Sequence, residues 1–145
     1  EKGEYGEGMK VRPGHLTLTG YRLPTEVEWE FACRGGTITA RYHGRGNELF
    51  PRYGWCQTTS GDRAWPVGQL RPNELGVFDA LGNAIERCET LAGEYSTRQL
   101  EESQGENATI VTERLSHVLR GGSFFYRPVV VRSGLRGDTR PGHAD

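Results

Sequence analysis

Long hydrophobic stretches are missing from this chain of 145 residues, of which only 34% are hydrophobic. No stretch approaches the roughly 20 apolar residues that a membrane-spanning helix needs, so we expect no membrane span. The net charge is -1, from 18 basic and 19 acidic residues, and this balance gives no reason to expect a nucleic-acid partner. The first residues contain neither an initiator Met nor a signal-peptide pattern, so we expect a processed or excised chain.

Cysteine is also scarce. Cys33, Cys56 and Cys88 are too few and too scattered for a disulfide framework or a paired-cysteine zinc site. We expect three buried thiols, with one disulfide and one free thiol as the alternative. The four histidines show no metal-ligand spacing, and neither a nucleotide-binding loop nor a Ser-His-Asp order is visible.

Glycine, by contrast, is abundant, with 21 residues, and indicates a loop-rich domain. The clearest helix is predicted at residues 25–34. Thr25 and Glu28 have the spacing of a capping box, and Gly35 follows as a stop signal. Val27 and Phe31 are four residues apart, so we expect them on the buried face, which Trp29, Ala32 and Cys33 would widen.

Short strands are predicted where β-branched or alternating residues occur, at residues 16–19, 118–120 and 129–131. Residues 94–116 form the most polar stretch, which we interpret as a solvated insertion or a short helix.

Five segments resemble, in order, the motifs of one family. They are residues 20–30 (GYRLPTEVEWE), 65–68 (WPVG), 76–86 (GVFDALGNAIE), 119–124 (LRGGSF) and 132–136 (RSGLR). Together they resemble sulfatase-modifying-factor domains, the formylglycine-generating-enzyme-like family. The resemblance implies an α+β, C-type-lectin-like fold with short strands, one or two helices and much irregular loop. We therefore expect residues 1–145 to form a single domain, partial by comparison with the family.

The resemblance also raises the question of catalysis. The oxidases of this family bind copper through two thiolates shortly after the GGS, because soft thiolates suit Cu(I). The first of these positions matches Tyr126 here, the second falls near Val130 or Val131, and no cysteine follows Cys88. Ser123 matches an active-site serine of the oxidases, but a serine alone does not hold copper. We therefore expect no copper and a non-catalytic module, with formylglycine-generating oxidase activity on sulfatase cysteines as the alternative.

The segment after the GGS is the predicted ligand-binding face, because aromatic side chains beside arginine are typical of interfaces. Between Gly121 and Asp145 the chain has no Lys, Glu, Gln, Trp or Met. Adenine-directed mutagenesis of Asn codons cannot produce these five residues, and retroelement-diversified members of the family carry their variable segment here. We therefore predict a protein or small-molecule ligand at this C-terminal face, and a variable protein of a diversity-generating retroelement. The candidate residues are Ser123, Phe125, Tyr126, Arg127, Val129, Arg140 and His143.

The family also includes kinase-fused members, so a regulatory domain of a larger protein is a further alternative. For the location we expect a soluble bacterial protein, either cytoplasmic or exported.

Asn83 and Glu86 match a Gly-Asn-x-x-Glu motif that the resemblance associates with calcium, and oxygen ligands suit this hard cation. The alternative is a turn asparagine and a glutamate paired with a core arginine. We expect Arg132 to pair with Glu26, Glu30 or Glu86 in a semi-buried network.

Overall fold

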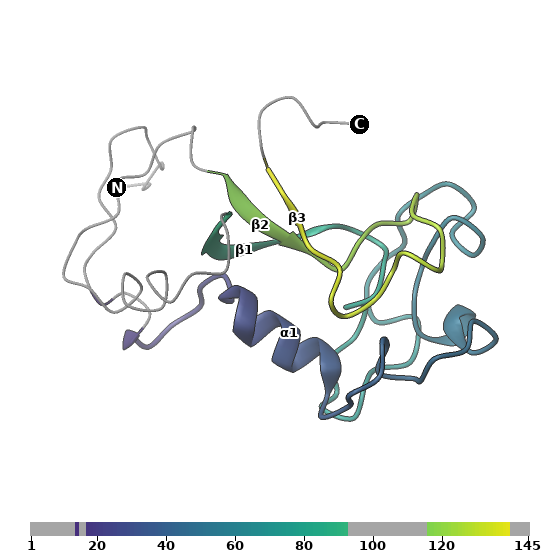
Figure 1. Ribbon diagram of the computed structural model, residues 1–145, viewed down its shortest axis with the longest axis horizontal. Coiled ribbons are helices and arrows are strands. Elements are labelled where there is room, and N and C mark those ends of the chain that lie inside the picture. The colour runs from purple at the N-terminus through teal and green to yellow at the C-terminus, as the bar shows by residue number, and fades with distance from the viewer. Residues whose placement is uncertain (1–13, 15–16, 93–115, 140–145) are drawn as a thin grey trace.

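The computed structural model describes Gly14, residues 17–92 and residues 116–139. Its regular elements are the helix α1 (Glu26–Arg34), the 3-10 helix η2 (Phe50–Arg52) and the strands β1 (Glu86–Leu91), β2 (His117–Arg120) and β3 (Gly137–Asp138). The strands form one antiparallel sheet in the order β1-β2-β3, and α1 packs against β1 and β2 (Figure 1). The other described residues are turns and irregular loops, so the predicted α+β architecture is confirmed.

Local signals set the two ends of α1 where the sequence predicts them. The Thr25 hydroxyl accepts a hydrogen bond from the Glu28 N–H at 3.3 Å, and the Glu28 carboxylate accepts one from the Thr25 N–H at 2.8 Å. Arg22 donates to the same carboxylate, and this hydrogen bond is the main reason that the pKa of Glu28 falls to about 2. Gly35 ends the helix in the left-handed region, with a φ of 54°.

The buried face of α1 is not the one that the apolar spacing predicts. Val27 and Phe31 are 69% and 70% exposed, so their predicted burial is wrong. Trp29 and Cys33 are buried as expected, but the third buried residue of the helix is Glu26. The helix turns this face inward because its carboxylates contact an arginine of β2.

The three strand predictions had different outcomes. Residues 118–120 lie in β2, as predicted. Of the predicted strand at residues 16–19, residue 16 lies outside the described residues and residues 17–19 form no strand, since the Thr17 N–H donates to the Gly14 carbonyl in a turn. Residues 129–131 also form a turn, because the N–H groups of Val130 and Val131 both donate to the Arg127 carbonyl. Strand propensity reflects the fit of a side chain to a sheet surface, and here no neighbouring strand of the described chain pairs with these valines.

The predicted polar insertion at residues 94–116 lies outside the described residues, apart from Ser116. None of the helices in the described part of the chain is long and apolar enough to cross a membrane.

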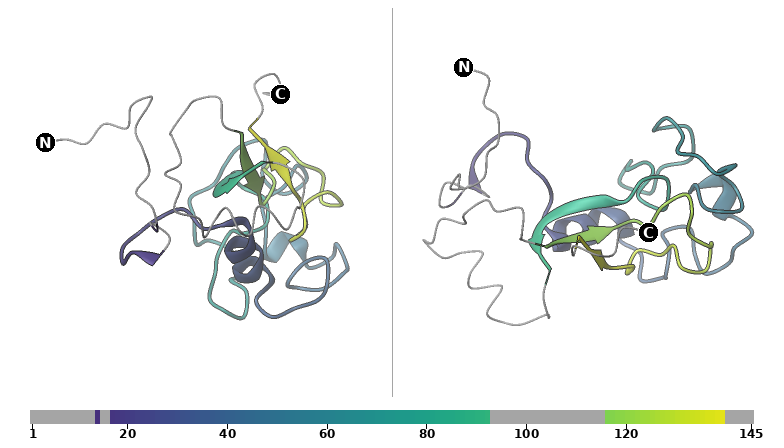
Figure 2. Two further views of the ribbon diagram at one scale, coloured as in Figure 1. Left: turned by 60° about the vertical axis from the view of Figure 1, so that its left-hand side comes forward. Right: turned by 90° about the horizontal axis from the view of Figure 1, so that it is seen from above.

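An irregular lobe, made of residues 37–85 and 121–136, lies beside the sheet (Figure 2). Its core contains buried Tyr42, Phe50, Cys56, Leu81 and Val131.

One close backbone approach joins two loops of this lobe. Gly82 forms a bridge with Trp55, and the Gly82 N–H donates to the Gly121 carbonyl at 2.9 Å. A Cβ at Gly82 would lie 1.8 Å from the Trp55 carbonyl oxygen, and the φ of Gly82 is 81°. Only glycine fits this position, for both reasons.

Candidate functional site

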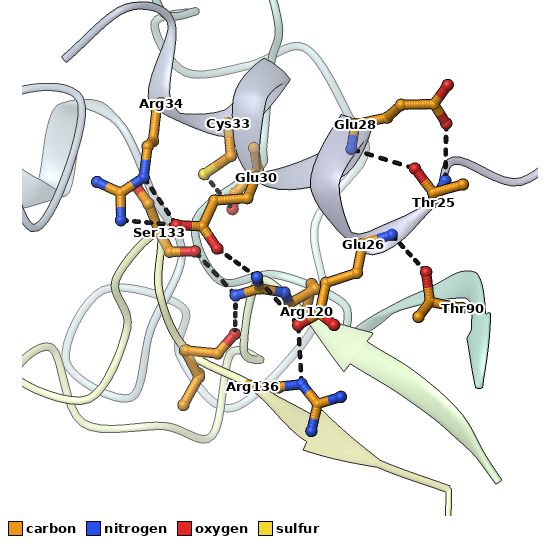
Figure 3. A network of polar contacts seen from close by, with 12 residues as sticks. Thr25, Glu26, Glu28, Glu30, Cys33, Arg34, Thr90, Arg120, Ser133 and Arg136 are labelled. Atoms are coloured by element: carbon orange, nitrogen blue, oxygen red, sulfur yellow. Dashed lines mark hydrogen bonds and ion pairs between the residues drawn. The ribbon is translucent and has the colours of Figure 1, made fainter. Parts of the chain in front are cut away.

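A buried ion-pair network joins α1 to β2 (Figure 3). Arg120 is 1% exposed, and its Nη2 contacts carboxylate oxygens of Glu26, at 3.1 Å, and of Glu30. Its Nη1 donates to the carbonyls of Ser133, at 3.2 Å, and Leu135, at 3.0 Å. This single guanidinium therefore connects the helix, the sheet and the loop after residue 131. It works as a structural centre rather than as a reactive group, since its charge is neutralised inside the protein.

Two further arginines complete the network. Arg136 donates to Glu26 at 2.8 Å, and Arg34 donates to Glu30 at 2.8 Å. Burial acts to raise the pKa of Glu30, but the hydrogen bonds from Arg34 and Arg120 outweigh it, so the pKa of Glu30 is lowered. The prediction that Arg132 fills this role is wrong, because Arg132 is exposed and the described network uses other arginines. Of the two arginines in the RSGLR segment, it is the second, Arg136, that contacts the helix.

Asn83 and Glu86, the predicted calcium ligands, have separate structural partners. The Asn83 side chain accepts from the Trp65 N–H at 2.9 Å and donates to the Trp65 carbonyl at 3.0 Å, so both ends of the amide are engaged. Glu86 Oε2 accepts from the Trp29 indole N–H at 2.6 Å. The alternative partner predicted for Glu86, a core arginine, is therefore replaced by a tryptophan.

Glu86 lies on the wall of a cavity of about 210 Å³, with Trp29, Cys33 and Phe78 among its neighbours. Burial raises the pKa of Glu86, and the indole hydrogen bond opposes this only in part. Its second oxygen, Oε1, accepts no hydrogen bond within the described residues, so it is available to a cation. No group of three or more His, Cys, Asp and Glu side chains in the described chain is arranged to hold a metal. Calcium binding by Asn83 and Glu86 stays a prediction.

All three cysteines are free thiols with 0% exposure, so the prediction of three buried thiols is confirmed. Burial raises the pKa of both Cys33 and Cys88 to about 11. The Cys33 thiol donates to the Ala80 carbonyl at 3.6 Å. Since the thiolate is the form that attacks substrates and binds Cu(I), this environment suits packing and not chemistry.

The segment after the GGS is fixed by its backbone. The Phe124 N–H donates to the Asn83 carbonyl at 2.9 Å, and the Tyr126 carbonyl accepts from the Gln57 N–H at 2.9 Å. Ser123 is buried, and its hydroxyl accepts from the Phe125 N–H at 3.3 Å. Ser123, a predicted ligand contact, therefore lies beneath the surface as part of a turn.

Most of the other predicted contacts share one exposed surface, which we call the 125–130 face. Its members are Phe125, Tyr126, Arg127, Val129 and Val130, all of them exposed. Phe125 and Val129 are 61% and 66% exposed, although a core would normally take such side chains. The predicted contacts Arg140 and His143 lie outside the described residues.

Sequence reasoning missed a stack of three side chains beside this face. The Trp55 and Trp65 rings are parallel to within 15°, with centroids 4.9 Å apart, and the Arg63 guanidinium lies 3.9 Å from the Trp65 centroid. Trp65 was visible in the WPVG motif, but its partners were not, because the stack depends on tertiary contacts.

Comparison with known proteins agrees with the motifs. Residues 2–145 match the sulfatase-modifying factor enzyme 1-like domain. The formylglycine-generating enzyme of Streptomyces coelicolor is 35% identical over 118 residues, which cover 72% of this chain and 36% of that enzyme. The serine/threonine-protein kinase pkn1 of Chlamydia pneumoniae is 30% identical over 130 residues, which cover 89% of this chain and 20% of the kinase.

Among solved structures, Treponema denticola variable protein 1 is similar with a TM-score of 0.66 and 29% identity, over 83% of this chain and 42% of that chain. This chain therefore spans well under half the length of each of these relatives. The match to the domain family nevertheless extends over nearly the whole sequence, and the chain belongs to the sulfatase-modifying factor enzyme 1-like family.

Proposed function

We propose that this domain is a non-catalytic binding module that holds a protein or small-molecule ligand on the 125–130 face. The observation that carries the proposal is a contrast between the cysteine thiols and the apolar side chains of the 125–130 face. Every thiol is buried, whereas Phe125, Tyr126, Val129 and Val130 are exposed together on one loop.

The loop is suited to recognition because its own backbone is already satisfied. Phe124 and Tyr126 form main-chain hydrogen bonds to Asn83 and Gln57, so ligand binding does not have to order the segment. A rigid surface of this kind loses little conformational entropy on association. Binding residues commonly lie on loops that a rigid scaffold holds in position.

Diversification by a retroelement is the finer part of the proposal. Its support is the restricted composition from Gly121 to Asp145, together with the similarity to a protein named as variable. Because the exposed side chains of this loop make few structural contacts, they are free to vary without loss of the fold.

A regulatory role within a larger protein is the second candidate. It is favoured by the similarity to the chlamydial kinases, which covers 89% of this chain but only 20% of the kinase of Chlamydia pneumoniae. Calcium, for which Glu86 keeps one carboxylate oxygen without a hydrogen bond in the described chain, would fit either function as a structural ion.

The binding proposal predicts no oxidase chemistry. The purified chain, loaded with Cu(I) and incubated with a Cys-x-Pro-x-Arg peptide, should bind no stoichiometric copper and leave the peptide mass unchanged. Conversion of the peptide cysteine to an aldehyde, read by mass spectrometry, would overturn the proposal.

The position of the site is tested separately. Random peptides displayed on phage would be selected on the wild-type chain and measured against the variant Tyr126→Ala, Arg127→Ala. Val67→Ala is a matched control, because Val67 is also exposed but lies in another turn. Val67→Ala should bind as the wild type does, and binding that survives the Tyr126→Ala, Arg127→Ala substitution would place the ligand elsewhere.

A further inference from the structure

A second loop, residues 57–65, lies side by side with the 125–130 face. The Gln57 N–H donates to the Tyr126 carbonyl at 2.9 Å, and the Ser60 hydroxyl donates to the Phe124 carbonyl at 3.2 Å. Asn83 joins the same two loops, since its carbonyl accepts from Phe124 and its side chain from Trp65. The two loops therefore form a continuous piece of surface.

The second loop is closed on itself and holds one arginine in place. The Ser60 hydroxyl accepts from the Asp62 N–H at 3.2 Å, and the Ser60 carbonyl accepts from the Trp65 indole at 2.6 Å. Asp62 has a φ of 58°, which marks a tight turn. The Arg63 guanidinium follows this turn and lies 3.9 Å from the Trp65 ring centroid. Stacking on an aromatic face positions an arginine while leaving its donors available.

Arg63 and Arg127 are both exposed, and neither forms an ion pair within the described residues. Asp62 is the one carboxylate of residues 57–65 and of residues 121–130, so the two loops together carry a net positive charge. An exposed arginine beside exposed aromatic side chains is typical of an interface.

The wider distribution of charge points the same way. Residues 40–71 and 116–139 contain six exposed arginines and three carboxylates, whereas residues 17–39 and 72–92 contain three arginines and seven carboxylates. In the ion pairs of Arg22, Arg34, Arg120 and Arg136, the acidic partners Glu26, Glu28 and Glu30 all lie in α1. The positive half of the described chain is therefore the half that carries the exposed aromatic loop, and it would attract an acidic partner over a distance of about 10 Å at ordinary salt.

We infer that loop 57–65 and the 125–130 face form one composite binding surface for an acidic protein partner, with Arg63 as a specificity-determining contact. The inference rests on the proposed binding function and adds the second loop and the class of the partner. The apolar centre, Phe125 and Val129, would supply contact area, and Arg63 and Arg127 would pair with Asp or Glu side chains of the partner. Electrostatic pairs of this kind determine which partner binds more than they add raw affinity.

The test uses the whole chain and a phage-displayed library of random 12-residue peptides. Peptides recovered on the wild-type chain should be enriched in Asp and Glu next to aromatic or aliphatic residues. Their affinity, measured by fluorescence anisotropy, should fall about tenfold with Arg63→Gln, and by less with Arg63→Lys, which keeps the charge. Arg87→Gln in β1 is the matched control, because it removes an equally exposed charge outside both loops, and it should change affinity less than about twofold.

The outcomes separate this inference from the proposed function. If Phe125→Ala weakens binding but Arg63→Gln does not, the binding function stands and the composite surface is rejected. If neither variant matters, both fall. Recovery of neutral or basic peptides, or of none above an empty support, rejects an acidic protein partner. A twelve-nucleotide oligothymidine that binds more tightly than every recovered peptide rejects it in favour of nucleic acid.

Discussion

Removal of the Arg120 side chain is the sharpest test of how this fold is held together. We consider Arg120→Met, which keeps most of the volume of the side chain and removes its charge. In the folded protein it would remove one of the arginines that contact Glu26, whose side chain is only 5% exposed, while Arg136 at 2.8 Å stays in place. It would also remove the donor to two carbonyls of the loop at residues 133–135.

The magnitude follows from the burial of both partners. Removing one member of a buried pair costs about 3–5 kcal/mol when the remaining charge has no other partner, and this range is an upper bound here, because Arg136 still contacts Glu26 and Arg34 still contacts Glu30. An ion pair at the surface contributes about 0–1 kcal/mol. Arg34, whose side chain is 32% exposed, forms such a pair in the same network and serves as the comparison for Arg120. We therefore expect Arg120→Met to lower the free energy of unfolding by up to about 5 kcal/mol, and by more than Arg34→Met, which should cost about 1 kcal/mol or less.

Urea unfolding at pH 7, followed by tryptophan fluorescence, measures both values. Arg120→Met combined with Glu26→Gln should recover part of the loss, because the buried carboxylate charge of Glu26 is then absent. Arg120→Lys should lie between the wild type and Arg120→Met, since one ammonium cannot serve two carboxylates and two carbonyls in the same geometry. A loss no larger for Arg120→Met than for Arg34→Met would refute the view that this arginine is the structural centre.

Three further predictions concern single positions. Because burial raises the pKa of Glu86, the folded chain binds its proton more tightly than the unfolded chain, and stability falls as pH rises through the window above 4.5. Glu86→Gln should therefore raise the Tm at pH 7 and have no effect near pH 4. Millimolar calcium should raise the Tm of the wild type but not of this variant, and a wild-type Tm that does not change with calcium contradicts the calcium prediction. Gly82→Ala should lower the free energy of unfolding, measured in urea, by more than about 2 kcal/mol. Gly68 has a similar φ of 78° but open space around it, so Gly68→Ala should cost only about 1 kcal/mol. Equal losses of stability in the two variants would disprove the steric argument. Thr25→Ala should cost about 1 kcal/mol through loss of the helix cap, and an unchanged urea midpoint would count against the capping box.

The ends of α1 were predictable because their signals are local. Thr25, Glu28 and Gly35 act within one turn of the helix, so their spacing alone specifies where it starts and stops. The buried face was not predictable in the same way. Val27 and Phe31 have the spacing of a core stripe, but the helix is oriented by the contact between Glu26 and Arg120, which are 94 positions apart in the sequence.

In the candidate site, too, the features set by local sequence were predictable and those set by tertiary contacts were not. The RGGS motif located the loop that carries Phe125 and Tyr126, because the pair of glycines marks where β2 ends. The valines at 129–131 were misread, since a turn closed by the Arg127 carbonyl prevailed over their strand propensity. The stack of Arg63, Trp65 and Trp55 could not be foreseen, because it depends on the bonds from the Asn83 side chain to the Trp65 backbone.

The motifs of the family and the surface that we propose for binding have different physical roles. Glu26 and Glu30 of the GYRLPTEVEWE segment contact the buried arginine of the LRGGSF segment, and the Asn83 side chain binds the backbone of Trp65. The side chains of the 125–130 face point outward, and the chain around them is held by main-chain hydrogen bonds that do not depend on side-chain identity. Changes on this face therefore alter what the surface can bind without removing a contact on which folding depends.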